Sequence, residues 1–273
     1  MGALAATDRW PVHTVAAAAV MPDGTVATVG PIDAPFRLAS LSKLLVAWAM
    51  LVACEEGTVH LDQPAGQPGC TLRHLLSHAG GYAFDGPTPI AKPGVRRIYS
   101  NSGIELAAAA LVEAAGMPFE AYLREAVLAP LGMSATQLRG SPAHGVTSTV
   151  ADLVLFVAEL RAPRLVHPNT AHAFRSVQYP GLAGIVPGVG RYDDCQWGLG
   201  AEIRGNKQPH WTGTLNSPET FGHFGGAGTL LWVDPGVQVA CLALTDRPFD
   251  EWSSVALQLW PALADAVVTE ARA

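Results

Sequence analysis

Apolar and polar residues follow the spacing of short β-strands at both ends of the chain. Near the N-terminus, residues 14–20 and 25–29 flank the turn Pro22-Asp23-Gly24, and this arrangement predicts a β-hairpin. In the C-terminal part, the pattern predicts further strands at residues 198–203, 229–233 and 237–244.

Between these strands the apolar residues recur with helical spacing. The first helix is expected from Ser40 to Glu56, with Gly57 ending it. This segment is apolar almost all round, so it belongs in the interior rather than on the surface. Further helices are predicted at residues 71–78, 104–115, 119–128, 149–161 and 257–268, the fourth with Ser148 or Thr149 as its cap.

The order of strands, helices, strands and a final helix predicts an α+β fold. The terminal segments would share one mostly antiparallel sheet flanked by helices, and the middle would form an inserted helical subdomain. We expect a single domain over residues 1–273, with an α/β lobe at about 1–60 and 191–273 and a helical lobe at about 61–190. The active site is expected in the cleft between the lobes.

Composition excludes several classes of protein. Hydrophobic residues make up 49% of the 273 and charged residues 15%, which is typical of a globular enzyme. A net charge of −6 argues against a nucleic-acid partner. The longest apolar run, residues 44–54, is much shorter than the roughly 20 residues of a membrane span. Asp8 and Arg9 lie where a signal peptide would be apolar, so we expect a cytoplasmic protein without a membrane partner.

No metal or cofactor is expected. His74 and His78 are four residues apart, as metal ligands on a helix can be, but there is no His-Glu-x-x-His motif. Dinucleotide-binding and P-loop sequences are absent as well, and so is the Gly-x-Ser-x-Gly elbow of α/β-hydrolases. The cysteines show no paired spacing that would predict a disulfide or a zinc site; they are Cys54, Cys70, Cys195 and Cys241.

The strongest candidate for chemistry is Ser40-Leu41-Ser42-Lys43 at the start of the apolar helix. Ser40 and Lys43 are three residues apart and would share one helix face. A serine hydroxyl becomes a good nucleophile when a base takes its proton, and burial can lower the pKa of a lysine enough for it to be that base. Taken alone, the motif is weak, because Ser40 could simply cap the helix.

Two further segments carry candidate residues. Tyr99 could relay a proton to the leaving group, and Asn101 could orient Lys43 or hold a substrate carbonyl. The segment His223-Phe224-Gly225-Gly226 could bind substrate, and the N–H groups of Ser40 and Gly226 could form an oxyanion hole. The alternatives are a buried tyrosine, a helix-start asparagine and a glycine-rich turn.

In combination, these motifs resemble the active-site segments of the serine β-lactamase and penicillin-binding-protein superfamily. The branch that they resemble contains class C β-lactamases, D-Ala-D-Ala carboxypeptidases and family VIII carboxylesterases. The resemblance spans about residues 12–250 and includes residues 36–43, 71–78, 80–82, 99–103, 130–133, 145–153, 197–200 and 222–225.

The resemblance implies that Ser40 is the acylated nucleophile, Lys43 its proton partner and Tyr99 a second acid/base. It makes Asn101, His223, Phe224 and Gly225 substrate contacts. His223 stands where β-lactamases have the lysine of Lys-Thr-Gly, and the connection over residues 30–39 is short for the family. The first departure favours peptidase or esterase relatives over efficient β-lactam hydrolysis, and the second favours small esters or amides.

We therefore expect a serine hydrolase that acts on a small ester or amide. A D-alanyl-D-alanine carboxypeptidase or a weak β-lactamase is the alternative within enzymes. A third hypothesis is an inactive ligand-binding homologue, although such a protein has no need of Ser40, Lys43 and Tyr99 together.

Overall fold

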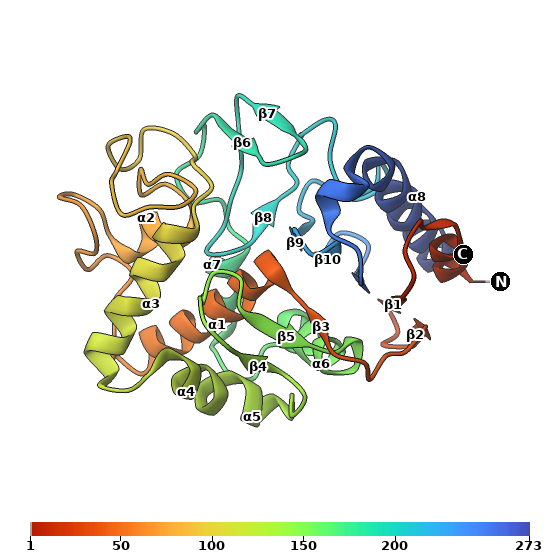
Figure 1. Ribbon diagram of the computed structural model, residues 1–273, viewed down its shortest axis with the longest axis horizontal. Coiled ribbons are helices and arrows are strands. Elements are labelled where there is room, and N and C mark those ends of the chain that lie inside the picture. The colour runs from red at the N-terminus through yellow and green to blue at the C-terminus, as the bar shows by residue number, and fades with distance from the viewer. Residues whose placement is uncertain (1) are drawn as a thin grey trace.

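A six-stranded antiparallel sheet forms one half of the molecule in the computed structural model, which describes residues 2–273 (Figure 1). The strand order is β2-β1-β11-β10-β9-β8. The strands are β1 (Val15–Val20), β2 (Val26–Val29), β8 (Glu202–Ile203), β9 (Phe221–Gly225), β10 (Thr229–Asp234) and β11 (Val239–Thr245).

The predicted hairpin forms at the N-terminal edge of this sheet. Val20 pairs with Val26, and the Asp23 carboxylate accepts a 2.8 Å hydrogen bond from the Thr25 N–H within the turn. Strand β1 also pairs with β11 along its whole length, from Val15 opposite Thr245 onward. The two ends of the sequence therefore share one sheet, as the sequence predicted.

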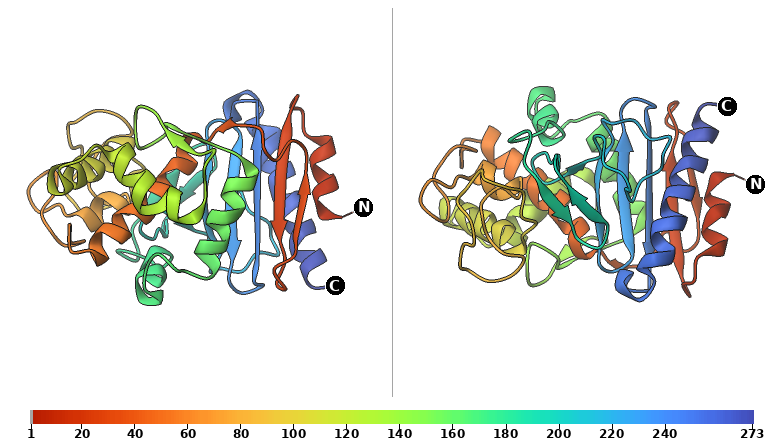
Figure 2. Two further views of the ribbon diagram at one scale, coloured as in Figure 1. Left: turned by 90° about the horizontal axis from the view of Figure 1, so that it is seen from below. Right: turned by 90° about the horizontal axis from the view of Figure 1, so that it is seen from above.

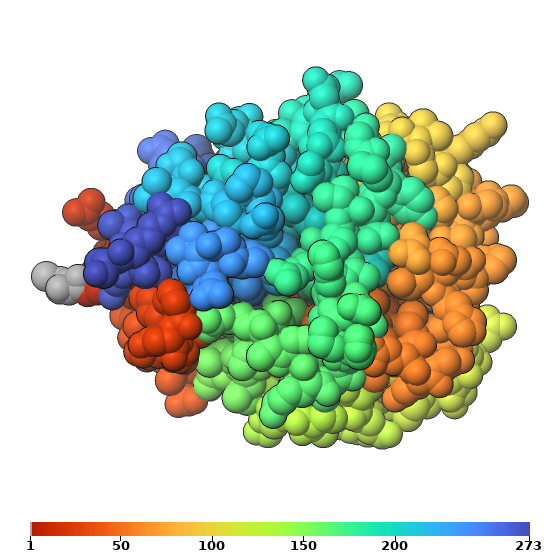
Figure 3. Space-filling model, turned by 180° about the vertical axis from the view of Figure 1, so that it is seen from behind, coloured from red at the N-terminus to blue at the C-terminus, as the bar shows by residue number. Residues whose placement is uncertain are grey.

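Helices cover both faces of the sheet (Figure 2). The C-terminal helix α8 (Ser253–Ala271) and the 3-10 helix η1 (Ala3–Arg9) pack on one face, where a tryptophan-rich core lies. On the other face α6 (Val150–Arg161) packs against β1 and β11, and α1 (Ser42–Glu55) belongs to the same core. Figure 3 shows the N-terminal and C-terminal segments meeting at one end of the molecule, opposite the segment around residues 50–80.

The predicted helices of the middle segment are confirmed with small shifts of their ends. Helix α3 begins at Asn101 because the Ser100 hydroxyl caps it by accepting a 3.0 Å bond from the Gly103 N–H. Thr149 caps α6 in the same way. The remaining helices are α2 (Leu72–Leu76), α4 (Phe119–Leu123), the π-helix η3 (Arg124–Leu128), α5 (Ala129–Leu131), α7 (Pro168–Phe174) and the 3-10 turn η4 (Phe249–Glu251).

Two small sheets lie outside the main one. One has the order β3-β5-β4, and the other pairs β6 with β7. Their bounds are β3 (Phe36–Arg37), β4 (Gln137–Leu138), β5 (Val146–Ser148), β6 (Gly184–Val186) and β7 (Gly190–Tyr192). The first sheet adjoins the start of α1, and the second borders the cavity described below.

The strand predictions near the site need two corrections. The strand predicted at residues 198–203 is restricted to β8, because Gly200 has a left-handed φ of +91° and its N–H bonds Leu76 instead of a neighbouring strand. Strand β9 was not predicted as a strand at all, yet it is buried between β8 and β10. The division into two lobes at residues 60 and 190 stays a prediction, and α6 from the middle segment packs on the sheet.

In the described chain, residues 2–273, no single helix has both the length and the apolar character needed to cross a bilayer. The segments Asn101–Ala115 and Phe119–Leu131 have this length and apolar character only when they are taken together, and the pair is bent by 85°.

Candidate active site

The central helix α1 carries the predicted nucleophile segment at its N-terminal end. The 3-10 turn η2 (Ala39–Leu41) precedes α1, so the single predicted helix begins with a tighter turn. All residues of α1 from Ser42 to Ala53 are buried, which confirms the prediction of an interior helix. Ser40 in η2 remains half-buried, so its hydroxyl stays within reach of a ligand.

The backbone just before Ser40 is held in an unusual conformation. Ala39 has a φ of +47°, a left-handed geometry that costs a residue with a Cβ about 1–3 kcal/mol. The preceding Leu38 is fixed on both sides: its N–H donates to Val146, and its carbonyl accepts a 2.9 Å bond from the Thr229 hydroxyl. The anchoring of Leu38 between β10 and the β5 segment therefore maintains the turn that presents Ser40.

Lys43 contacts Ser40 as the spacing predicted. The Lys43 Nζ lies 3.2 Å from the Ser40 Oγ, 2.7 Å from the Asn101 Oδ1 and 2.9 Å from the carbonyl oxygen of Ala143. A neutral amine has two N–H donors and one lone pair. The amide and carbonyl oxygens can only accept, so they take the two N–H groups, and the lone pair then faces the serine hydroxyl.

Burial brings the pKa of Lys43 down from its ordinary value of 10.5 to about 7, because the low-polarity interior disfavours the ammonium form. The Asp85 and Glu105 carboxylates oppose this change, since their negative charge stabilises the ammonium. At neutral pH a large fraction of the amine is therefore free base. The surrounding residues of α1, which are apolar, supply this burial.

Tyr99 lies beside this pair, directly before the cap of α3. The Lys43 Nζ is 4.9 Å from the centre of the Tyr99 ring, and the Tyr99 hydroxyl is 3.2 Å from the His223 Nε2. Burial raises the pKa of Tyr99 well above its ordinary range, although a hydrogen bond with Ser40 opposes the shift. Tyr99 is therefore a protonated phenol at neutral pH and can donate a hydrogen bond or a proton.

His78 fixes the position of Tyr99, which sequence reasoning did not anticipate. The backbone carbonyl of His78 accepts a 2.8 Å bond from Ile98, and its Nδ1 accepts a 3.1 Å bond from the Ser100 N–H. The two bonds bracket Tyr99 along the chain, and the imidazole also packs 4.6 Å from the tyrosine ring. The resemblance at residues 71–78 was the only signal, and it gave His78 no role.

Strand β9 brings the glycine segment to the nucleophile. A Cβ on Gly225 would lie 2.2 Å from the Leu38 carbonyl oxygen and 3.2 Å from the Ser40 nitrogen, so only glycine permits this approach. The N–H of Gly226, the next residue, has no backbone or side-chain acceptor among residues 2–273. This donor is therefore available near the Ser40 backbone, where the sequence placed an oxyanion hole.

His223 is buried beside Tyr99, and burial together with the nearby Lys43 charge lowers its pKa to about 3. It is therefore a neutral imidazole at physiological pH. Phe224 requires a correction, because its side chain points to the opposite face of the sheet and packs against Trp211, Phe249 and Trp260. Successive strand residues face opposite sides, so β9 presents His223 but turns Phe224 away.

Asn101 links Lys43 to the surface. Its Oδ1 accepts from Lys43, as given above, and its Nδ2 donates a 3.1 Å bond to the carboxylate of the exposed Asp85. The loop around Asp85 is tied to the start of α3 by two more bonds, from the Asn101 N–H to Phe84 and from the Ser100 hydroxyl to Ala83. Asp85 and the Ala143 carbonyl are thus site groups that the sequence did not reveal.

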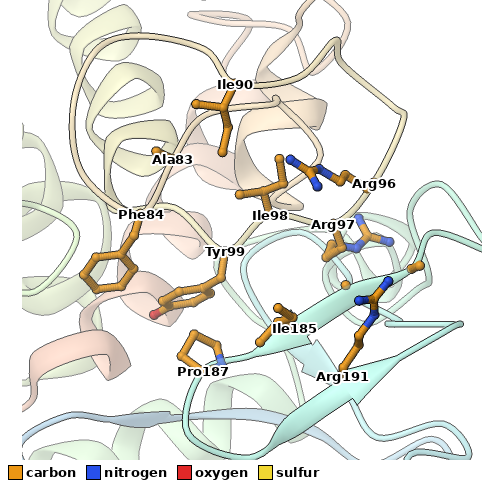
Figure 4. Close-up of a pocket in the computed structure, with 12 residues that line it drawn as sticks. Ala83, Phe84, Ile90, Arg96, Arg97, Ile98, Tyr99, Ile185, Pro187 and Arg191 are labelled. Atoms are coloured by element: carbon orange, nitrogen blue, oxygen red, sulfur yellow. The ribbon is translucent and has the colours of Figure 1, made fainter.

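A cavity of about 510 Å³ adjoins Tyr99 (Figure 4). Its walls are mostly apolar, and three guanidinium groups also border it. The lining residues are Ala83, Phe84, Ile90, Arg96, Arg97, Ile98, Tyr99, Ala183, Gly184, Ile185, Pro187 and Arg191. A volume of this size is within the range of about 300–1,000 Å³ that is typical of small-molecule sites.

No cluster of three or more His, Cys, Asp or Glu side chains in residues 2–273 is arranged to hold a metal ion. The groups that the site brings together are a hydroxyl, an amine near its pKa, a phenol and free backbone N–H groups. These are the components of nucleophilic acyl transfer, in which a serine is acylated and then released.

Known proteins resemble this chain in sequence and fold. The chain is 48% identical to a β-lactamase from Mycobacterium bovis whose crystal structure superposes with a TM-score of 0.95, covering 98% of this chain and 99% of that one. EstCE1, described as a hydrolase with promiscuous acyltransferase activity, has the same fold at 18% identity, with a TM-score of 0.78 and 96% of each chain covered. A putative D-alanyl-D-alanine carboxypeptidase of Escherichia coli O157:H7 is 24% identical over 83% of this chain and 73% of its own length.

The model of the Beta-lactamase family matches residues 12–264, which is nearly the whole chain. The sequence motifs, the fold and the geometry around Ser40 agree with this match. The chain belongs to the β-lactamase family, within the superfamily of serine hydrolases.

Proposed function

We propose that this protein is a serine hydrolase that forms an acyl-enzyme on Ser40 and acts on small carboxylic esters or amides. The observation that carries the proposal is the 3.2 Å contact between the Ser40 Oγ and the buried Lys43 Nζ. The pKa of about 7 makes this amine a competent base at neutral pH.

In the first half-reaction, the Lys43 amine takes the hydroxyl proton while the Ser40 Oγ attacks the substrate carbonyl carbon. The negative charge on the carbonyl oxygen is stabilised by the N–H groups of Ser40 and Gly226, each such donor being worth about 3 kcal/mol. Tyr99 then gives a proton to the departing alcohol or amine and regains one from Lys43. Asn101 accepts a hydrogen bond from the Lys43 Nζ and so keeps the amine beside Ser40.

In the second half-reaction, a water molecule replaces the leaving group. It gives up a proton to the Tyr99 and Lys43 pair as it attacks the acyl carbon, and the Ser40 oxygen is reprotonated when the acid product leaves. Atoms balance over the cycle, because one ester or amide bond and one water become an acid and an alcohol or amine.

The neutral state of His223 disfavours substrates that carry a carboxylate next to the scissile bond. By the resemblance, this position on β9 is a lysine in β-lactamases, where a cation can attract a substrate carboxylate. Here the pKa of His223 is about 3, so β9 supplies no positive charge above that pH. A neutral acyl group next to the scissile bond is therefore the better fit.

A D-alanyl-D-alanine carboxypeptidase is the second candidate, because relatives that cover most of this chain carry that name. An inactive binding protein is the third candidate, but the complete set of Ser40, Lys43 and Tyr99 in contact argues against it. A cytoplasmic location is part of the proposal, and cell fractionation with an antibody against the chain tests it.

Intact-protein mass spectrometry separates the three candidates. The protein is treated with a fluorophosphonate, with benzylpenicillin and with p-nitrophenyl acetate, and Ser40→Ala is the matched control. We expect fluorophosphonate labelling at Ser40 together with turnover of the ester. A long-lived penicilloyl adduct would favour the carboxypeptidase, and no adduct from any reagent would favour the binding protein.

A further inference from the structure

The cavity beside Tyr99 combines apolar walls with two guanidinium groups that have no partner within residues 2–273. Phe84, Ile90 and Ile185 line it and are 50–56% exposed, which is unusual for side chains of this size. Exposed apolar side chains gathered around one hollow mark a binding surface more often than chance scatter does. The cavity is therefore suited to an apolar part of a ligand.

The arginines of the cavity differ in what they already bind. Arg97 is buried, and its guanidinium donates to four backbone carbonyls, of Ser77, Gln178, Tyr179 and Cys195. These bonds use four of its five N–H groups, so Arg97 is a structural residue.

In contrast, the side chains of Arg96 and Arg191 have neither a hydrogen bond nor an ion pair with any group in residues 2–273. Both are exposed at the cavity. They come from separate segments, the loop before Tyr99 and strand β7. Their five-donor forks are available for an anion, and a guanidinium binds a carboxylate through two parallel hydrogen bonds.

The two kinds of wall lie at opposite ends of the cavity. In Figure 4, Phe84 and Tyr99 are at one end, and Arg96 and Arg191 are at the other, with Ile90 and Ile185 between them. The Tyr99 hydroxyl points away from the arginines, towards His223. A ligand that extends from the reacting serine through the cavity would therefore meet apolar side chains first and positive charge last.

From this juxtaposition we propose that the acyl group of the substrate is an apolar chain that ends in a carboxylate, bound by Arg96 and Arg191. The inference rests on the proposed function, since it assigns the substrate class of the same site. The leaving group departs on the hydroxyl side of Tyr99, and the acyl chain that stays on Ser40 occupies the cavity. Next to the scissile carbonyl, β9 supplies a neutral imidazole, and the far end of the cavity supplies the positive charges of Arg96 and Arg191. Together they favour half-esters of medium-length dicarboxylic acids as substrates.

The first test compares p-nitrophenyl esters of one chain length that differ only at the far end. One substrate is the monoester of octanedioic acid with a free carboxylate, and the other has that carboxylate capped as a methyl ester. We expect kcat/KM for the carboxylate form to be roughly tenfold higher, and the ratio to fall as salt is raised from low to about 0.5 M, because the ions screen exposed charges.

Variants show whether the arginines cause the preference. Arg96→Gln and Arg191→Gln should each lower the ratio, and the double variant should bring it close to one. Arg124→Gln, an exposed arginine on the π-helix η3, is the matched control and should keep the ratio. Equal rates for both esters in the wild type, or an unchanged ratio in the double variant, would overturn the inference while ester turnover itself upheld the serine hydrolase.

A binding measurement keeps the inference testable if the chain hydrolyses no ester. Isothermal titration with octanoate, octyl phosphate and octanol uses the same cavity without any reaction. Octanoate should bind at least tenfold more tightly than octanol, and the double arginine variant should lose this difference. Tighter binding of octyl phosphate than of octanoate would replace the carboxylate with a phosphate, and no preference for either anion would refute the assignment.

Discussion

Removing the charge of Asp85 should move the pH dependence of the enzyme to lower pH. The Asp85 carboxylate raises the pKa of Lys43, in opposition to burial. Asp85→Asn takes away this charge but keeps an oxygen that can accept the hydrogen bond from the Asn101 Nδ2. The pKa of Lys43 should then fall below about 7, so the free-base form persists into more acidic solution.

The expected size of the shift follows from the geometry. The Lys43 Nζ and the Asp85 carboxylate are joined through one amide group by contacts of 2.7 and 3.1 Å. They are therefore at most about 8 Å apart, given ordinary covalent dimensions. Coulomb's law then gives about 2 kcal/mol at an effective dielectric constant of about 20 and about 0.5 kcal/mol in water. The corresponding change is about 0.4–1.5 pKa units, nearer the lower end because Asp85 is exposed.

The assay is kcat/KM for p-nitrophenyl acetate between pH 5 and 9, since this parameter reports the ionisation of the free enzyme. The wild type should lose activity as the pH falls through about 7, and Asp85→Asn should lose it at lower pH. Glu105→Gln should shift the profile in the same direction. Glu113→Gln, an exposed carboxylate on the same helix α3, is the control.

An unchanged acid limb in Asp85→Asn, or a limb displaced to higher pH, would contradict the assignment of Lys43 as the titrating base. An equal displacement by Glu113→Gln would attribute the effect to overall charge instead. A rate in Lys43→Ala close to that of the wild type would remove the lysine from the reaction altogether.

Three other outcomes follow from the same contacts. Lys43 loses its proton near pH 7 in the folded protein and near pH 10.5 in the unfolded chain. Between these values the free energy of unfolding of the wild type should therefore rise by about 1.4 kcal/mol per pH unit relative to that of Lys43→Met. A pH-independent difference between the two proteins in urea denaturation would refute this. His223→Ala removes the partner of the Tyr99 hydroxyl and should lower kcat/KM up to about tenfold. The acid limb of the pH profile should not move, because the pKa of His223 is about 3. A displaced acid limb would show that His223 titrates between pH 5 and 9. Gly225→Ala should lower the rate of ester turnover far more than Gly226→Ala. A Cβ on Gly225 would lie 2.2 Å from the Leu38 carbonyl oxygen, whereas a Cβ on Gly226 would have no atom within 4 Å. Equal losses would show that β9 need not approach the nucleophile so closely.

The predictions that succeeded rest on local patterns. The hairpin needed only Asp23-Gly24 between apolar segments, and the interior helix needed only its lack of a polar face. The contact of Ser40 with Lys43 follows from a separation of three residues near a helix start. Each of these features is decided by residues within one turn or one hairpin of each other, so the sequence alone carries them.

The features that escaped prediction depend on distant segments. Strand β9 has glycines at two of its five positions, a composition typical of a turn, and it is a strand because β8 and β10 pair with it on both sides. The outward direction of Phe224 follows from strand parity only once that strand is known. Lys43 donates a hydrogen bond to the backbone carbonyl of Ala143. Every residue has such a carbonyl, so the identity of residue 143 does not predict this contact.

Helix α1 lies in the core of the fold and also carries Lys43, the base of the site. The packing of the core therefore affects the reactivity of the site. A pKa near 7 instead of 10.5 means that the interior, with Asp85 and Glu105 included, disfavours the charged lysine by about 5 kcal/mol relative to water. The apolar packing of the rest of α1 offsets that cost. At pH 7 the shift increases the free-base fraction roughly a thousandfold over an exposed lysine. Any substitution in α1 that admits water beside Lys43 would return its pKa towards 10.5 and reduce the rate, even if Ser40, Tyr99 and β9 stayed in place. Tight packing around Lys43 is therefore itself a requirement of the reaction.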